Sequence, residues 1–84
     1  MWMVEKKGIR GNMKYIKIIH VGTSPTGKTN IWSVQTLENV EIGFIKWFGS
    51  WRKYVFWPHS GTLYDASCLK EITEFINEQM NKRK

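Results

Sequence analysis

One stretch decides the fold: Ile42-Gly-Phe-Ile-Lys-Trp-Phe-Gly-Ser-Trp-Arg-Lys-Tyr-Val-Phe-Trp57. Apolar-rich runs flank Gly49 and Ser50, and a two-residue type II′ hairpin turn requires a glycine at its first central position. The stretch therefore predicts a β-hairpin that carries most of the aromatic residues. The turn sets the register, which pairs Phe48 with Trp51, Trp47 with Arg52, Lys46 with Lys53, Ile45 with Tyr54, Phe44 with Val55, Gly43 with Phe56 and Ile42 with Trp57.

This register predicts two unlike faces on the hairpin. Like charges directly opposite each other on paired strands repel, so Lys46 facing Lys53 among aromatic rings indicates a place for an anion. The alternative is a solvated face on which lysine stems cover the rings. The first face is apolar except for a guanidinium that can stack on the opposite indole, and it comprises Gly43, Ile45, Trp47, Arg52, Tyr54 and Phe56. The second face comprises Ile42, Phe44, Lys46, Phe48, Trp51, Lys53, Val55 and Trp57.

Length and charge limit the classes of function. The 84 residues suffice for one small domain and are too few for a cleft between two domains. The chain is 42% hydrophobic, which is typical of a globular domain. It lacks the apolar run of ~18 residues that a transmembrane helix needs. Thirteen Lys and Arg residues against seven Asp and Glu residues give a net charge of +6. This balance favours nucleic acid or an acidic protein surface as partner.

The N-terminal residues and the single cysteine indicate where in the cell the protein is expected. Residues 1–12 combine basic residues and glycines without a sustained period, so we expect a flexible basic arm that either frays or touches phosphates. Charged residues directly follow Val4, which is unlike a secretory segment, and we expect no export. The single cysteine, Cys68, cannot form an internal disulfide and is typical of a reducing cytoplasm.

Two further strands are expected before the hairpin. Residues 14–21 are rich in β-branched side chains. In residues 31–37, Trp32, Val34 and Thr36 alternate with Ile31, Ser33, Gln35 and Leu37, which is the two-residue period of a strand. Residues 38–39 then form a short turn. A helix over residues 31–41 is the alternative, because their apolar positions also recur every three residues. The β-branched and aromatic enrichment favours the strand.

The connection Gly22-Thr-Ser-Pro-Thr-Gly-Lys-Thr29 matches the phosphate-binding pattern G-x-x-x-x-G-K-[ST]. In a phosphate-binding loop, Lys28 would contact terminal phosphates and Thr29 would bind magnesium. The required context is missing, because the residues after Thr29 alternate like a strand and no later strand ends in a suitable aspartate. Pro25 and Gly27 are ordinary loop formers. We therefore interpret the match as a hairpin connection.

A C-terminal helix follows the hairpin. Pro58 ends strand pairing because it has no amide hydrogen. Asp65 or Ser67 is then placed to cap a helix. The apolar positions of this helix follow a 3.6-residue period and are Cys68, Leu69, Ile72, Phe75, Ile76 and Met80.

The predicted fold is α+β, with all elements in one domain over residues 13–84. A four-stranded antiparallel sheet, built as a meander of hairpins, is covered on one face by the single C-terminal helix. We expect the helix to pack on the first hairpin face, where Gly43 would permit its close approach.

The hairpin and helix letters resemble a group of short uncharacterised phage and prophage proteins. Their pattern, over about residues 31–80, is L-G-x-I-K-W-Y, W-R-x-Y-x-F and C-L-x-x-I-x-x-F-I, here with Ile42 for the leucine and Phe48 for the tyrosine. The resemblance implies a viral or prophage origin, hence a host cytoplasm, and no particular activity. Four strands and one helix are also similar in architecture to the PC4-type single-stranded DNA-binding coactivators, whose sheet and basic loops hold unpaired strands, often as a dimer.

No catalytic or metal-binding group emerges from the sequence. His20 and His59 are far apart and have no Cys or carboxylate at ligand spacing. Cys68 falls on the apolar side of the helix, which favours a core residue over a nucleophile. We therefore expect a non-enzymatic protein without a metal or cofactor.

The first functional hypothesis is binding of single-stranded nucleic acid, with bases stacked on exposed rings and phosphates held by lysines. The alternative is a protein-binding accessory or inhibitor, a phage factor that engages a host or phage enzyme through the same surface. Self-association as a homodimer is a third alternative, and none of the three involves a membrane. The candidate binding residues are Lys46, Trp51, Lys53, Trp57, Phe44 and Lys28.

Overall fold

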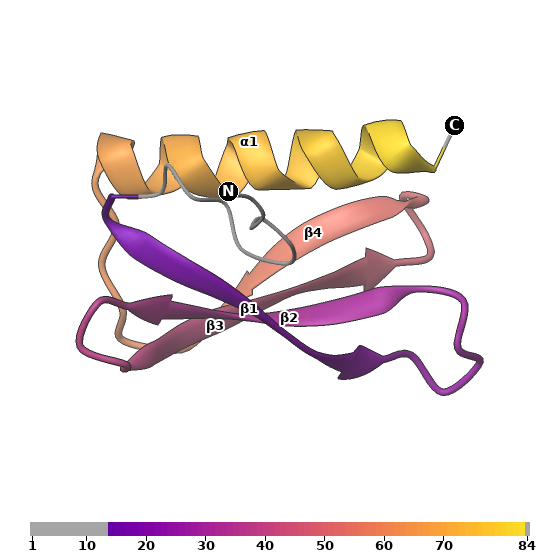
Figure 1. Ribbon diagram of the computed structural model, residues 1–84, viewed down its shortest axis with the longest axis horizontal. Coiled ribbons are helices and arrows are strands. Elements are labelled where there is room, and N and C mark those ends of the chain that lie inside the picture. The colour runs from indigo at the N-terminus through magenta and orange to yellow at the C-terminus, as the bar shows by residue number, and fades with distance from the viewer. Residues whose placement is uncertain (1–13, 84) are drawn as a thin grey trace, which may run out of the picture.

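The computed structural model describes residues 14–83, so the basic arm expected over residues 1–12 lies outside the described residues. The described chain forms one antiparallel sheet in the order β1-β2-β3-β4, followed by one helix (Figure 1). This architecture confirms the predicted α+β fold, and the alternative helix over residues 31–41 is wrong. The elements are β1 (Ile16–Thr23), β2 (Asn30–Thr36), β3 (Glu41–Phe48), β4 (Lys53–Pro58) and α1 (Ala66–Lys82).

The sheet has a covered and an uncovered face. Helix α1 packs on one face, called here the inner face, and no described element covers the other, the outer face (Figure 1). Side chains alternate between the two faces along each strand. The inner face comprises Ile16, Ile18, Trp32, Val34, Ile45, Trp47, Tyr54 and Phe56. The outer face includes Lys17, Ile19, Ser33, Gln35, Phe44, Lys46, Phe48, Lys53, Val55 and Trp57.

The core lies between the inner face and α1, as predicted from the hairpin. Trp32 is at its centre, and its ring makes edge-to-face contacts with Tyr54 at 5.1 Å and with Phe75 of α1 at 5.0 Å between centroids. All three rings are buried. Large aromatic side chains bury about 150–250 Å² each, so this cluster supplies much of the area that a small domain without disulfides needs.

Helix α1 begins after Asp65, whose carboxylate accepts a hydrogen bond from the Cys68 amide at 2.9 Å. Such a cap satisfies one of the free amides at a helix start, and the same bond lowers the pKa of the Asp65 carboxyl. Ile72 and Phe75 are buried against the sheet, as the predicted period required. Leu69 was predicted on the same side but is 46% exposed, so the buried stripe is narrower than predicted.

The connection between β3 and β4 is longer than the predicted two-residue turn. Phe48 pairs with Lys53 instead of Trp51, a shift of two residues, and residues 49–52 form the loop. The amides of Trp51 and Arg52 donate to Phe48 O at 3.2 and 3.0 Å, and Arg52 has a φ of 56°. A left-handed residue after a type I turn is a common way to close a hairpin. Because side chains alternate with a period of two, the shift leaves the paired residues on their predicted faces.

Ile42 is an exception, because it was predicted on the outer face and is 7% exposed in the core. The β2–β3 register shifts between Val34 and Gln35, which leaves Ile42 as the extra residue of a β-bulge on β3. The bulge turns its side chain towards α1. Its carbonyl accepts hydrogen bonds from the His59 amide at 2.8 Å and the Tyr64 hydroxyl at 3.0 Å.

Gly43 allows a close approach, but not the one predicted. A Cβ atom at Gly43 would lie 2.5 Å from Trp57 O and 2.9 Å from Pro58 Cα, both on β4. Its cross-strand partner is Pro58 rather than the predicted Phe56. The predicted role of Gly43 in admitting the helix is therefore wrong, since the crowding comes from the β4 backbone and from the Phe56 ring, whose Cε1 would lie 2.8 Å away.

The segment that matched a phosphate-binding loop is the β1–β2 hairpin connection, as interpreted from the sequence. Ser24 N donates to Thr29 O at 2.9 Å, and Gly27 N donates to Ser24 O at 2.8 Å, so these amides are engaged within the loop. A strand, not a helix, follows Thr29.

Two loops and the end of α1 lie at the same end of the sheet. The β1–β2 loop (24–29) and the β3–β4 loop (49–52) both lie at the right of Figure 1, where α1 also ends. The β2–β3 turn (37–40) and the start of α1 lie at the opposite end.

Candidate functional site

A line of aromatic rings runs from the outer face onto the β3–β4 loop. Phe48 stands between Trp51 in the loop and Trp57 on β4, with ring centroids 4.9 and 5.7 Å apart and both contacts edge to face. Trp51 is 62% exposed and Trp57 is 37% exposed. Trp51 is therefore the aromatic residue most open to a ligand among residues 14–83.

Lys46 lies against the second of these tryptophans. Its Nζ is 4.8 Å from the centroid of the Trp57 ring, and Trp57 Nε1 donates to Lys46 O at 3.3 Å. A cation over an exposed ring contributes about 0.5–1 kcal/mol. This contact orients the Lys46 ammonium on the outer face, while Trp51 has no such cation among the described residues.

The prediction that Lys46 and Lys53 face each other directly is wrong. Lys46 pairs with Val55, and Lys53 pairs with Phe48, because the loop is longer than predicted. The two lysines are diagonal neighbours on the outer face, a more distant relation than direct opposition. Like-charge repulsion across a strand pair therefore no longer argues for an anion at this place.

The structure brings most of the predicted binding residues together. Trp51 belongs to the β3–β4 loop, and Lys28 lies in the β1–β2 loop at the same end of the sheet rather than on a face. The predicted site residues on the outer face itself are Phe44, Lys46, Lys53 and Trp57.

The predicted stacking of Arg52 on Trp47 is also wrong. Arg52 belongs to the loop, and Trp47 pairs with Tyr54. A different guanidinium takes the place: Cζ of Arg83, directly after α1, is 4.3 Å from the Trp47 ring centroid and 5.9 Å from that of Tyr54. The inner face thus receives its cation from the helix layer.

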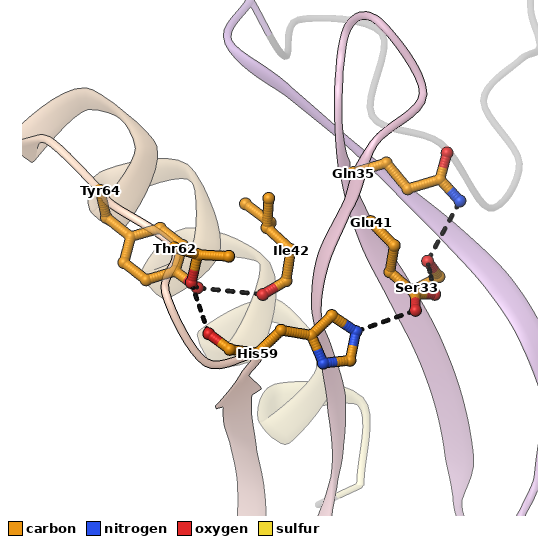
Figure 2. Close-up of polar contacts among 7 residues, drawn as sticks. All are labelled: Ser33, Gln35, Glu41, Ile42, His59, Thr62 and Tyr64. Atoms are coloured by element: carbon orange, nitrogen blue, oxygen red, sulfur yellow. Dashed lines mark hydrogen bonds and ion pairs between the residues drawn. The ribbon is translucent and has the colours of Figure 1, made fainter.

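A polar cluster occupies the other end of the outer face, near the β2–β3 turn (Figure 2). Ser33 Oγ donates to Glu41 Oε2 at 2.6 Å, and Gln35 Nε2 donates to Ser33 Oγ at 3.1 Å. His59 Nε2 lies 2.9 Å from Glu41 Oε1. The bond from Ser33, followed by that from His59, lowers the pKa of the Glu41 carboxyl. No sequence pattern indicates this cluster, because it depends on the bulged register of β2 and β3.

This cluster differs from a hydrolytic triad. In a triad the imidazole stands between the hydroxyl and the carboxylate and takes the hydroxyl proton. Here Glu41 stands between Ser33 and His59, and Ser33 is only 1% exposed. The arrangement connects β2, β3 and the segment after β4, and it does not activate Ser33 as a nucleophile.

A hollow of about 430 Å³ lies between the start of β1 and α1. The Glu71 carboxylate in its wall accepts hydrogen bonds from the amides of Lys14 at 2.9 Å and Tyr15 at 3.2 Å. The carboxylate thus joins β1 to the helix. The remaining walls mix both charges, with Ser67, Lys70 and Glu74.

The elements that meet at the two ends of the domain in Figure 1 differ in the charged residues that they carry. We call the end with the β1–β2 loop, the β3–β4 loop and the end of α1 the basic end, and the opposite one the mixed end. The basic end carries the exposed residues Lys28, Arg52, Lys53, Lys82 and Arg83. The mixed end carries Lys14, Lys17, Lys70, Glu38, Glu41, Asp65 and Glu71.

Other kinds of site are not formed by residues 14–83. Within this range, no helix is long and apolar enough to cross a membrane. Nor does the described chain gather His, Cys, Asp and Glu side chains into a group that could hold a metal ion. Cys68 packs against the core, and burial raises the pKa of its thiol.

Comparison with known proteins gives one informative similarity. An uncharacterised 9.3 kDa protein of Acholeplasma phage L2 is 41% identical over 46 residues. The matched segment spans 55% of this chain and 59% of the phage protein, less than two thirds of its length. The chain is thus similar to a short phage protein, as the sequence suggested. No family model matches the chain. No solved structure matches it either.

Proposed function

We propose that this protein is a small non-enzymatic binder of single-stranded nucleic acid. The observation that carries the proposal is the 62% exposed Trp51 ring at the edge of an uncovered sheet face that also presents Lys46 and Lys53. Single-strand binders combine rings on which bases stack with cations that hold the backbone. The net charge of +6 has the sign that a polyanion requires.

The aromatic line favours stacking at Trp51 in particular. Phe48 supports the Trp51 indole from its edge at 4.9 Å, so the exposed ring is held by a contact within the domain. Trp57 already contacts the Lys46 ammonium, which offers the positive charge beside the ring to a phosphate. In this proposal a base stacks on Trp51, and the adjoining phosphates lie near Lys46 and Lys53.

The wider setting of the proposal is a phage one. We propose that the similarity to the phage protein extends to the L-G-x-I-K-W-Y, W-R-x-Y-x-F and C-L-x-x-I-x-x-F-I pattern, and that the protein acts in a host cytoplasm. The likeness in strand and helix order to PC4-type coactivators is compatible with strand binding by the sheet, on analogy of architecture alone.

The test is titration with fluorescent single-stranded oligonucleotides at two salt concentrations. Stacking contributes about 1–3 kcal/mol per base, so Trp51→Ala should lower the affinity about 5- to 150-fold. Tyr15→Ala is the matched control. Tyr15 directly precedes β1, is 51% exposed and lies away from the aromatic line. The control should bind like the wild type.

Two outcomes contradict the proposal. One is absence of binding by the wild type at low salt, and the other is equal loss in Trp51→Ala and Tyr15→Ala. If a host or phage protein is instead retained after nuclease treatment and Trp51→Ala abolishes that retention, the protein-binding alternative replaces the proposal.

A further inference from the structure

We infer that the contact surface extends over the basic end, which binds the phosphate backbone of the strand whose base stacks on Trp51. This inference rests on the proposed function. It adds the end of α1 to the interface, an element that no pattern in the hairpin indicates. The bound strand would therefore pass around the end of the sheet rather than lie along its face.

Positive and negative charges are separated along the longest dimension of the domain. The principal extents are 38 × 31 × 20 Å, and the two ends in Figure 1 lie along the longest axis. The Debye length is about 10 Å at 0.1 M salt. Carboxylates at the mixed end are thus screened from a ligand at the basic end, whose cations act as a separate positive patch.

Two cations of the basic end are free to bind a ligand. Lys28 and Lys82 are exposed, and neither side chain forms an ion pair with any residue in the range 14–83. At the mixed end, by contrast, Lys17 Nζ is hydrogen-bonded to Asn39 Oδ1. The end of a helix carries only about −0.5 of a charge, which the cations around it exceed. Glu78 also lies in the last turns of α1, so the end is predominantly rather than purely basic.

Arg83 is held in a fixed position at the basic end. Its guanidinium lies over the Trp47 ring at 4.3 Å, and its amide donates to Met80 O at 3.1 Å. A guanidinium over a ring still has several N–H donors, and their planar fork matches a phosphate. Arg83 is therefore held in place before a ligand arrives, which lowers the entropy lost on binding.

The experiment compares two double neutralisations that change the net charge equally. Lys28→Gln with Lys82→Gln alters the basic end, and Lys14→Gln with Lys70→Gln alters the mixed end. Each lowers the net charge from +6 by two, to +4. All four side chains are exposed, and none belongs to the aromatic line. Circular dichroism verifies that the variants fold.

Binding of a single-stranded oligonucleotide is measured between 50 and 200 mM salt. Each lost phosphate contact lowers the slope of log affinity against log salt by about 0.7, so the basic-end variant should lose about 1.4. The ratio of wild-type affinity to variant affinity should therefore fall about sevenfold between 50 and 200 mM salt. The mixed-end variant should keep the wild-type slope. Lys82→Gln alone should lose about 0.7, and quenching of Trp51 at saturation should be unchanged.

Equal slopes for the two double variants would overturn the inference, since net charge alone would then decide the affinity. A slope change caused by Lys28→Gln but not by Lys82→Gln would remove the end of α1 from the interface and overturn it too. Both results leave the proposed function standing. Absence of wild-type binding at low salt overturns the proposed function, and this inference with it.

Discussion

The inner and outer faces of the sheet each carry a tryptophan beneath a cation, and the two cations come from different parts of the fold. On the inner face Arg83 lies over Trp47 at 4.3 Å, and on the outer face Lys46 lies over Trp57 at 4.8 Å. Arg83 comes from the helix layer, so its contact joins the end of α1 to the inner face. Lys46 comes from the neighbouring strand, and no described element covers it. The outer pair therefore presents its cation on the open sheet face, whereas the inner pair presents its cation at the end of the helix layer.

The same contrast holds for the phenylalanines, and it gives the largest expected effect. Phe75 is 2% exposed in the core, whereas Phe48 is only partly buried on the outer face. Phe75→Ala should cost about 3–5 kcal/mol of unfolding free energy, because it opens a cavity between the layers. Phe48→Ala should cost less than half as much, as measured by urea denaturation. Equal losses would mean that the outer face is packed like the inner one.

Gly43 is crowded by the β4 backbone and by the Phe56 ring of the inner face. Gly43→Ala should cost about 1–3 kcal/mol by overpacking, since the new Cβ would meet the β4 backbone at 2.5 Å. Gly49→Ala is the control, because a Cβ at Gly49 has nothing within 4 Å. Urea midpoints that fall equally for both variants would contradict this account of the β3–β4 approach.

Helix α1, which covers the inner face, can be destabilised at its N-terminus without changing a residue of either face. Asp65→Ala removes the cap of α1 and should cost about 1 kcal/mol of unfolding free energy. Asp65→Asn keeps a capping oxygen and should stay close to the wild type. Thermal melts followed by circular dichroism measure both. If Asp65→Asn loses as much as Asp65→Ala, the charge matters and the hydrogen bond to Cys68 does not.

The smallest expected effect is a pH dependence confined to the outer face. The folded-state pKa of Glu41 is lowered from the ordinary value of 4.5. Its stabilising contribution is therefore complete above about pH 4.5 and is lost as the pH falls through the lowered pKa. Glu41→Gln should flatten the fall of the urea midpoint between pH 5 and pH 3. Glu38→Gln, in the nearby turn, is the control and should follow the wild type more closely.

Much of the fold could be predicted because it depends on local patterns. Alternation of side chains identified the strands, and the 3.6-residue period with the Asp65 cap identified the helix. Alternation along the hairpin also placed Ile45 and Tyr54 on the face that α1 covers. The candidate site was predicted in part for the same reason. Even a wrong turn left Lys46 and Trp57 on the outer face, since a shift of two residues preserves parity.

The errors concern contacts that local pattern does not specify. The length of the β3–β4 loop decided that Lys46 and Lys53 are diagonal neighbours and that Arg52 leaves Trp47. The bulge at Ile42 moved an expected outer-face residue into the core. Each error involves one or two residues in a loop or a β-bulge, where the same sequence is compatible with several backbone geometries.

The sequence by itself determined the elements, their order and the two-sidedness of the sheet, because periodicity and capping act between residues close in the chain. Only the tertiary structure decided which residues from distant segments meet. It brought Arg83 to Trp47, gathered Ser33, Glu41 and His59, and collected Lys28, Arg52 and Lys82 at one end of the domain. Antiparallel pairing and the direction of α1 decide these meetings, since they determine which ends of the elements coincide.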